Sequence, residues 1–221
     1  MLICAAGDIH GAMDRLYEDV LAFELLLGVR FGHVLHVGDF GIWPDSSRID
    51  KATRHHDGAG DFPVWLKEHR AVPRPTVFIK GNHEDFVWLD AHEAAEVLPG
   101  LTYLRNGRAI DIQDQTGGGI RVGGVGGMDI VLTHDAPTGV RFERHRGGTG
   151  YVSEAKGLDV LLARVRPRVC CFGHHHTRVD AEVSGIRCIG LNKVAMPGNL
   201  IAIDMEPGKR DWSLLGEFRQ S

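Results

Sequence analysis

Histidine, aspartate and asparagine recur at five separate points of this 221-residue sequence, in four of them beside glycine. The five segments read GDIHG, GDFG, GNHE, THDAP and FGHHH, and each follows a short apolar run. They contain seven side chains that could bind metal through nitrogen or oxygen: Asp8, His10, Asp39, Asn82, His134, His174 and His176. Seven such ligands are too many for one tetrahedral zinc ion, and they suit two divalent cations that share a carboxylate.

Two neighbouring cations support the chemistry of phosphoesters. Held about 3.5–4 Å apart, they clamp a phosphoryl group and lower the pKa of a bridging water from about 15.7 towards neutrality. A set of carboxylate, amide and imidazole ligands without thiolate suits manganese, iron, nickel, cobalt or zinc. We therefore expect two divalent transition-metal ions, with manganese the leading candidate, and hydrolysis of a phosphoester by a metal-bridging hydroxide.

The hydrophobic pattern predicts strands that would bring these segments together. Each segment follows one of five expected strands, at Leu2–Ala6, Val34–Val37, Thr76–Ile79, Ile130–Thr133 and Arg168–Phe172. Helices are expected over Ala12–Leu27, Phe62–His69, Phe86–Val97 and Ser153–Val165. Further strands are expected within Leu101–Val125, Ala181–Ile203 and Trp212–Phe218. Because sites in α/β sheets gather at the carboxyl ends of strands, the five segments point to one place.

In this order the five segments resemble the signature of the calcineurin-like metallophosphoesterase superfamily, which reads D-x-H, G-D, G-N-H-E/D, H and G-H-x-H. The resemblance extends from residue 8 to residue 176. It implies an α/β fold, a four-layer sandwich of two mixed β-sheets flanked by helices, with a di-metal site at the strand ends. We expect residues 1–221 to form a single metallophosphoesterase domain.

The resemblance also implies a role for each residue. The first metal would be bound by Asp8, His10 and His176. The second metal would be bound by Asn82, His134 and His174, with Asp39 bridging the two. His83 matches the residue that assists the leaving group or orients the phosphate, and it is the expected catalytic residue. His175 occupies the variable position of the last segment and is expected to point away.

Two departures from related sequences affect the expected substrate. Protein Ser/Thr phosphatases carry G-D-x-x-D-R-G as their second segment, whereas this chain has GDFGIWP, so a phosphodiester or a small phosphomonoester is favoured over a phosphoprotein. The segment between GGVGG and His134 consists only of Met128 to Thr133, whereas related proteins often carry a longer segment there. The sequence therefore leaves undefined the part of the site that faces the substrate. A solvated loop is the simpler interpretation of the segment after His134. Its arginines are weak candidates for phosphate contacts: Arg141, Arg144 and Arg146.

Several other polar residues have simpler interpretations. His36 is expected to be a packed core histidine, and His55 and His56 are expected to be solvated loop residues. Glu84 and Asp85 could fix an imidazole, or they could be acids in the first turn of a helix.

The amino-acid composition argues against some classes of protein function. A formal net charge of -4 argues against a dedicated duplex-DNA binder. The four cysteines lie in apolar runs without CxxC spacing and are expected to be reduced. The sequence shows no signal-like segment and no run long enough to span a membrane. We therefore expect a cytoplasmic protein with no membrane association and no implied protein partner.

Three functions remain open at this point. The first is a metal-dependent phosphoesterase whose partner is a phosphoester substrate, with a nucleotide or a nucleic-acid end among the candidates. The second is a metal-binding scaffold of the same fold without turnover, for which loss of ligands or of His83 would be the mark. The third is a nuclease or end-processing phosphatase that acts on short or single-stranded nucleic acid.

Overall fold

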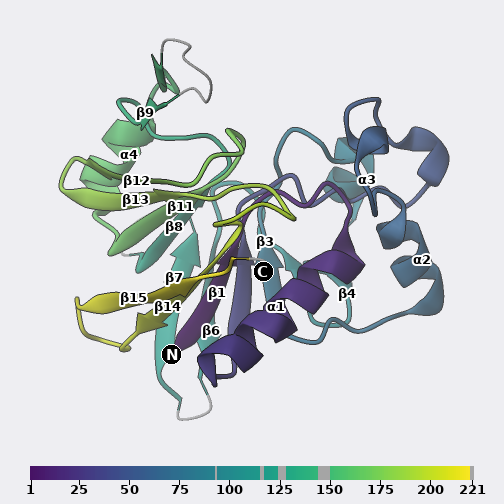
Figure 1. Ribbon diagram of the computed structural model, residues 1–221, viewed down its shortest axis with the longest axis horizontal. Helices are drawn as coiled ribbons and strands as arrows, with labels where there is room; N and C mark the ends of the chain where they lie inside the picture. Colours follow the sequence, from purple (N-terminus) through teal and green to yellow (C-terminus); the bar gives the residue numbers. More distant parts are fainter. Residues whose placement is uncertain (93, 115–116, 124–127, 144–149, 220–221) are drawn as a thin grey trace.

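Two mixed β-sheets form the centre of the molecule (Figure 1). The computed structural model describes the chain apart from residues 93, 115–116, 124–127, 144–149 and 220–221. Within the described residues the first sheet, sheet A, has the strand order β15-β14-β1-β2-β3-β5-β4. Its strands are β1 (Leu2–Ala6), β2 (His33–His36), β3 (Thr76–Phe78), β4 (Glu96–Leu98), β5 (Leu101–Tyr103), β14 (Leu200–Met205) and β15 (Trp212–Glu217).

The second sheet, sheet B, has the order β12-β13-β11-β8-β7-β6 in the described part of the chain. Its strands are β6 (Ala109–Gln113), β7 (Gly119–Gly123), β8 (Ile130–Thr133), β11 (Val169–Phe172), β12 (Val179–Val183) and β13 (Ile186–Gly190). A separate ribbon pairs β9 (Arg141–Phe142) with β10 (Tyr151–Val152). In sequence, sheet B therefore lies between β5 and β14 of sheet A.

Apolar side chains leave the central strands on both faces. On β1, Ile3 packs between the two sheets, whereas its neighbour Cys4 packs in the cluster that contains the helix side chains. On β11, Cys171 faces the space between the sheets and Phe172 faces the opposite side. Both strands are continuously apolar in sequence because parallel strands with both faces covered need no polar side.

Helices cover the outer face of each sheet and complete four layers (Figure 1). Helices α1 (Met13–Leu27) and α2 (Asp61–Glu68) pack on sheet A through side chains such as Phe23 and Trp65. Helix α4 (Leu158–Val165) packs on sheet B through Leu162 and Val165. The prediction of a four-layer sandwich of two mixed sheets flanked by helices is therefore confirmed.

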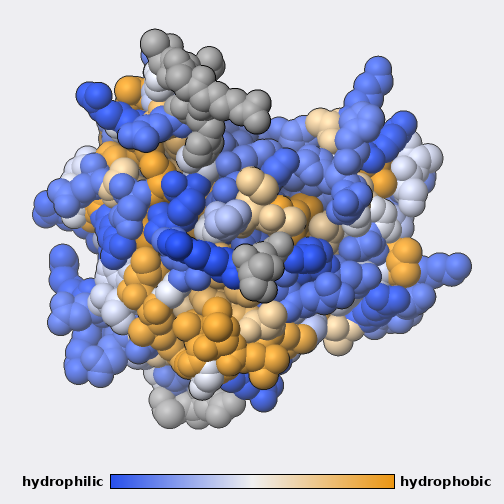
Figure 2. Space-filling model, viewed as in Figure 1, coloured by the Kyte–Doolittle hydropathy of each residue, from blue (hydrophilic) through white to orange (hydrophobic). Residues whose placement is uncertain are grey.

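Helix α1 has one face in the core and one in solvent. It ends at Gly28, whose φ of 66° lets its N–H bond the carbonyl oxygens of Glu24 and Leu25. Leu25 and Leu26 are 85% and 68% exposed on the outer side of the helix. Figure 2 shows hydrophobic side chains gathered over this helix. These leucines lie off the buried stripe of Leu16, Val20 and Phe23 and contribute little to the core.

Parallel pairing carries the site segments to one edge of the sandwich. Strands β1, β2 and β3 are parallel neighbours in sheet A, and β8 and β11 are parallel neighbours in sheet B. Their carboxyl ends lead directly into the segments GDIHG, GDFG, GNHE, THDAP and FGHHH. The predicted meeting of the five segments therefore follows from strand direction alone.

Two predicted helices are shorter than expected. The helix expected over Phe86–Val97 is α3 (Phe86–Ala91), and the end of that range forms β4 instead. Val97 and Leu98 are buried there, and β4 pairs with β5 in sheet A, so tertiary pairing outweighs the helical spacing. The helix expected from Ser153 starts at Leu158, because Gly157 has a φ of 91° and Ser153 Oγ donates to the Ala136 carbonyl oxygen.

Three further predictions concern the loop after β2, the cysteines and membrane-spanning segments. The loop-like stretch from Pro44 to Gly60 contains two 3-10 turns, Ser46–Arg48 and Thr53–His55. All four cysteines are buried and free, in agreement with the prediction of reduced core residues. Among the described residues, no helix combines the length and the apolar character that crossing a bilayer requires.

Candidate metal centre and active site

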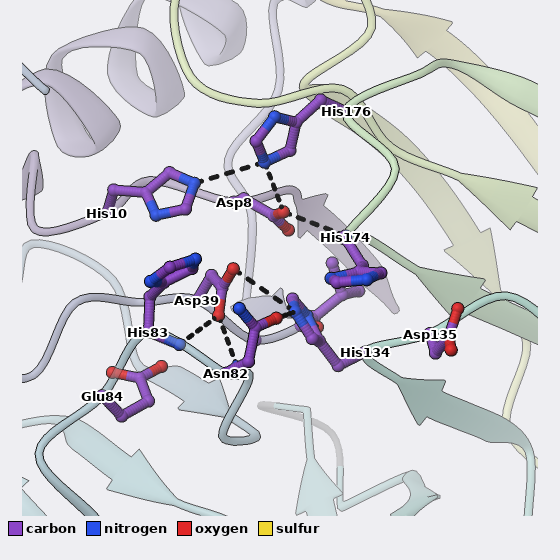
Figure 3. A network of polar contacts seen from close by, with 12 residues as sticks. Asp8, His10, Asp39, Asn82, His83, Glu84, His134, Asp135, His174 and His176 are labelled. Atoms are coloured by element: carbon purple, nitrogen blue, oxygen red, sulfur yellow. Dashed lines mark hydrogen bonds and ion pairs between the residues drawn. The ribbon is translucent and has the colours of Figure 1, made fainter. Parts of the chain in front are cut away.

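The first group of potential metal ligands consists of Asp8, His10 and His176 (Figure 3). Their ligand atoms lie within 4.8 Å of one another, with His176 Nε2 3.1 Å from Asp8 Oδ2 and 3.2 Å from His10 Nε2. Asp8 Oδ1 and His10 Nδ1 are buried and have no hydrogen-bond partner among the described residues. A buried carboxylate and two imidazoles that converge, with one carboxylate oxygen left unpartnered, fit a divalent cation.

The second group consists of Asp39, His134 and His174, whose ligand atoms also lie within 4.8 Å of one another. His134 Nε2 is 3.3 Å from Asp39 Oδ2 and 2.9 Å from Asn82 Oδ1, so the amide oxygen reaches the same point (Figure 3). Asp39 Oδ1 accepts hydrogen bonds from the backbone N–H groups of Asn82 at 2.6 Å and His83 at 2.8 Å. The structure therefore brings all seven predicted ligands to one site, in two groups.

The backbone at this site takes an uncommon conformation. Four of the predicted ligands have positive φ: His10 at 49°, Asp39 at 52°, His174 at 65° and His176 at 47°. Left-handed backbone is uncommon for residues other than glycine and clusters at functional sites when the surrounding structure enforces it. The site is also closely packed, because a Cβ added at Gly173 would lie 2.1 Å from Asp8 Oδ1.

Burial and charge set the protonation of the site before any cation binds. Burial lowers the pKa of His10 to about 3, so its imidazole is neutral and can ligate. Burial acts in the same direction on His134, but its hydrogen bond and ion pair with Asp39 outweigh burial and raise its pKa to about 9. Burial would raise the pKa of Asp39, yet the same contact holds it well below the usual range. Cation binding through His134 therefore releases a proton.

His83 lies beside both groups without belonging to either. Its ring packs edge-on against His10, with the centroids 5.3 Å apart. Its Nδ1 donates to Asp50 Oδ2 at 3.0 Å, and Asp50 is itself fixed by the N–H groups of Ala52 and Thr53. Asp50 was not predicted from the sequence, because it lies in no motif and is brought to His83 only by the loop between β2 and α2.

Glu84 and Asp85 have different roles, and in the described part of the chain neither fixes an imidazole. Glu84 is buried and accepts the N–H groups of Phe40, Gly41 and Ile42 at 2.7–2.9 Å, which holds the loop that carries Asp39. Asp85 caps α3, because its side chain accepts the N–H of Trp88. Glu84 is therefore a support of the ligand loop, and Asp85 is a helix cap.

The sequence predicts no metal-binding role for His36 and His56. His36 is fully buried and packs against Phe40, as expected of a core histidine. His56 is a partly exposed loop residue, as expected, but it also makes a contact that the sequence does not predict. Its ring stacks on His10 with the centroids 4.2 Å apart, because the loop from Pro44 to Gly60 folds back over the first ligand group.

The remaining predicted residues are His175 and three arginines. His175 belongs to neither ligand group; its Nε2 is 2.8 Å from Asp135 Oδ1 and its Nδ1 is 2.8 Å from the Tyr151 hydroxyl. Arg141 is exposed on β9. Arg144 and Arg146 lie outside the described residues.

Comparison with known families identifies this arrangement. A family model described as the calcineurin-like phosphoesterase superfamily domain matches residues 1–205. The chain belongs to this superfamily. The expected family and the expected class of enzyme, a phosphoester hydrolase, are thereby confirmed. Superfamily membership also implies divalent metal ions, which agrees with the two ligand groups.

Several curated members of the superfamily resemble this chain at modest identity. The lariat debranching enzyme of Entamoeba histolytica is 22% identical over 92% of this chain and 72% of its own length. That of Arabidopsis thaliana is 24% identical over 94% of this chain and 64% of its own length. That of Schizosaccharomyces pombe is 23% identical, and the alignment spans 83% of this chain but only half of the relative.

A solved structure supports the fold. The calcineurin-like phosphoesterase YfkN of Bacillus subtilis aligns with a TM-score of 0.53, 12% sequence identity, and coverage of 99% of this chain and 89% of that one. At this identity the likeness concerns the fold alone. The expected single domain and the individual roles of the site residues stay predictions.

Proposed function

We propose that this calcineurin-like phosphoesterase hydrolyses phosphodiesters by means of two divalent transition-metal ions, with manganese the leading candidate. The relatives named as lariat debranching enzymes support a nucleic-acid diester, because their alignments reach over 92% and 94% of this chain. The chain also retains both ligand groups and His83, whereas loss of these would have marked a non-catalytic scaffold.

The proposed ligand assignment follows the two groups. Asp8, His10 and His176 hold the first ion. Asn82, His134 and His174 hold the second, and Asp39 supplies the carboxylate between them. Asp39 is suited to that position because its oxygens face different partners: Oδ2 lies near His134, and Oδ1 is fixed by two backbone N–H groups. Bound cations would supply hydroxide near neutral pH and neutralise charge on the phosphoryl group.

The observation that carries the proposal is the pairing of His83 with Asp50. A carboxylate that accepts from Nδ1 fixes the orientation of the ring and leaves Nε2 as the nitrogen that can face a leaving oxygen. His83 also touches the rim of the first group through its contact with His10. A scaffold that only bound metal would have no use for a histidine held in this way.

Metal add-back on matched substrates tests the proposal. The protein is stripped with chelator and then supplied with manganese, nickel, zinc or magnesium. Bis(4-nitrophenyl) phosphate, a diester, and 4-nitrophenyl phosphate, a monoester, are compared. We expect a transition metal, manganese foremost, to restore hydrolysis and the diester to be preferred. Full activity of the stripped protein with no metal retained would refute the metal requirement, and turnover of the monoester alone would refute the diester.

A further inference from the structure

Two clefts adjoin the metal centre, one beside each ligand group, and they differ in charge. One has a volume of about 540 Å³ and is lined by His56, which stacks on His10 of the first group. Its charged lining includes the four acids Asp14, Glu18, Asp57 and Asp61 and the two cations Arg15 and Lys193. The other, which we name the Arg108 cleft, has a volume of about 330 Å³ and begins at His134 of the second group.

The Arg108 cleft is basic. It runs between the loops that follow β3, β5 and β8, and its charged lining is Lys80, Arg105, Arg108 and Asp135. Three cations therefore face one carboxylate, and that carboxylate is engaged by His175 at 2.8 Å. In a chain of net charge -4, an anionic substrate would extend from the metal centre into this cleft rather than into the acidic one.

Arg108 is the cation that remains available in this cleft. Lys80 Nζ lies 3.3 Å from Asp90 Oδ1 and over the Phe86 ring, and Arg105 donates to the carbonyl oxygens of Leu89 and His92. The Arg108 side chain is exposed, and among the residues that the structure describes it makes neither a hydrogen bond nor an ion pair. Its guanidinium is therefore free to bind a phosphate in two-point geometry.

We propose that the Arg108 cleft binds a second, non-cleaved phosphate of an extended nucleotide substrate. The inference rests on the proposed diesterase function, because it needs the scissile phosphate at the ligand groups beside His134. The volume of about 330 Å³ is near the lower bound for small-molecule pockets, which suits a single nucleotide unit. The second phosphate could belong to the next unit of an oligonucleotide or to a nucleotide that carries more than one phosphate.

Equilibrium binding to the metal-loaded protein is the first test. The probe is a fluorescein-labelled phosphorothioate tetranucleotide, which resists hydrolysis, and its anisotropy is followed at several salt concentrations. Arg108→Ala is expected to raise the Kd about fivefold, the effect of one partly exposed ion pair. The slope of log Kd against log salt should fall by about 0.7, the value for one phosphate contact on a single strand. Arg108→Lys should retain most of the binding.

The matched control is Arg210→Ala. Arg210 is an exposed arginine in the turn between β14 and β15, at the end of sheet A opposite the metal centre. Its loss should leave the Kd and the salt slope unchanged. Unlabelled tetranucleotide and thymidine diphosphate are then used as competitors, and the one whose competition depends on Arg108 identifies the source of the second phosphate. Absence of binding by the unmodified protein, or equal behaviour of Arg108→Ala and Arg210→Ala, would overturn the inference.

Hydrolysis separates failure of this inference from failure of the proposed function. The unmodified protein is assayed on the tetranucleotide with natural phosphates and on bis(4-nitrophenyl) phosphate, which has only one phosphate. For Arg108→Ala we expect the ratio of kcat/KM between the long and the short substrate to fall about fivefold, mainly through KM. No hydrolysis of either substrate by the metal-loaded protein refutes the diesterase, whereas an unchanged ratio refutes only the second phosphate site.

Discussion

His83 and Asp39 are hydrogen-bonded neighbours whose side chains face different partners. The His83 backbone N–H donates to Asp39 Oδ1 at 2.8 Å, so both residues depend on the same turn of chain. The Asp39 carboxylate lies in the second ligand group, whereas the His83 ring turns towards Asp50 and His10. Substitutions at these two positions should therefore impair activity for different reasons, which measurements can distinguish.

Asp39→Ala should lose metal, and His83→Ala should lose turnover while keeping metal. Removal of the Asp39 carboxylate leaves two cations facing each other with less negative charge, so metal content should fall below two per chain. His83→Ala should cost about 10²–10⁴-fold in rate for a substrate that leaves as an alkoxide, and less for one that leaves as a nitrophenolate. Elemental analysis and rates on both substrates provide the comparison.

Asp50→Asn is the companion variant. It keeps the His83 ring and the metals but removes the carboxylate that accepts from His83 Nδ1. Its rate should fall by less than that of His83→Ala, with the same dependence on the leaving group. If His83→Ala loses as much metal as Asp39→Ala, His83 is a ligand or a structural support, and its assignment as the acid is wrong.

The predicted ligands that the structure brings together are those whose spacing carried the information. Two histidines separated by one residue after a buried strand, and an aspartate beside a glycine, are patterns that a local reading can recognise. Asp50 and His56 were missed because their roles depend on how the loop between β2 and α2 folds over the ligands. Nothing in the types or spacing of their neighbours predicts that path.

Among the elements, α1 is fixed to the sheet by a charge pair near its C-terminus. Glu24 is buried and accepts the Phe31 N–H at 2.6 Å, together with Arg74 Nε at 2.8 Å and Nη2 at 2.6 Å. Burial would raise the pKa of Glu24, but the hydrogen bonds from Arg74 and Phe31 outweigh it and hold the pKa below its usual value. This pair ties α1 to the loop that leads into β3.

Glu24→Gln should destabilise the fold in a pH-dependent way. Because the folded pKa of Glu24 is lowered, its contribution is present above the unfolded pKa of about 4.3 and is lost as the pH falls through the lower folded value. At pH 7 the variant should lose about 1.5–3 kcal/mol of unfolding free energy, the range for a hydrogen-bonded charge. Urea unfolding between pH 3 and pH 7 measures this difference.

Glu18→Gln provides the control on the same helix. Glu18 is exposed, so its substitution should change stability by less than about 0.5 kcal/mol at every pH. A constant difference between Glu24→Gln and the unmodified protein from pH 3 to pH 7 would contradict the ionised pair as its cause.

The elements that were predicted correctly are those whose pattern is long or whose ends are marked. Helix α1 has three turns of helical spacing and a glycine at its end, and β1 and β11 are continuous apolar runs. The error near Val97 has a physical basis, since a three-residue strand has too few positions to display a period of two. Its pairing with β5 decided the outcome, and that pairing is not visible locally.

In the whole molecule, the metal centre lies where the two sheets meet. Asp8, Asp39 and Asn82 follow strands of sheet A, whereas His134 and the pair of ligand histidines after β11 follow strands of sheet B. Each ligand group therefore takes side chains from both sheets. Cations at this place would hold the sheets together as well as act on a substrate.

Metal removal should lower thermal stability. A ligand that binds only the folded state adds about 2.7 kcal/mol at one hundred times its dissociation constant. For a chain of this length each kcal/mol corresponds to about 2–4 °C, so chelation should lower the midpoint by about 5–11 °C. Calorimetry with and without chelator, with metal content verified by elemental analysis, measures the shift. An unchanged midpoint after confirmed metal loss would show that the cations do not join the sheets.

The strand order of sheet A has a consequence for synthesis on the ribosome. Strand β1 pairs with β2 on one side, but its other neighbour is β14, with Leu2 opposite Asp204. All of sheet B is translated before that neighbour exists. At a translation rate of about 5–20 residues per second, the edge of β1 that pairs with β14 stays unpaired for roughly 10–40 s. An apolar strand edge exposed for that long is a site where nascent chains can associate, and a chaperone that covers it would raise the yield of folded protein.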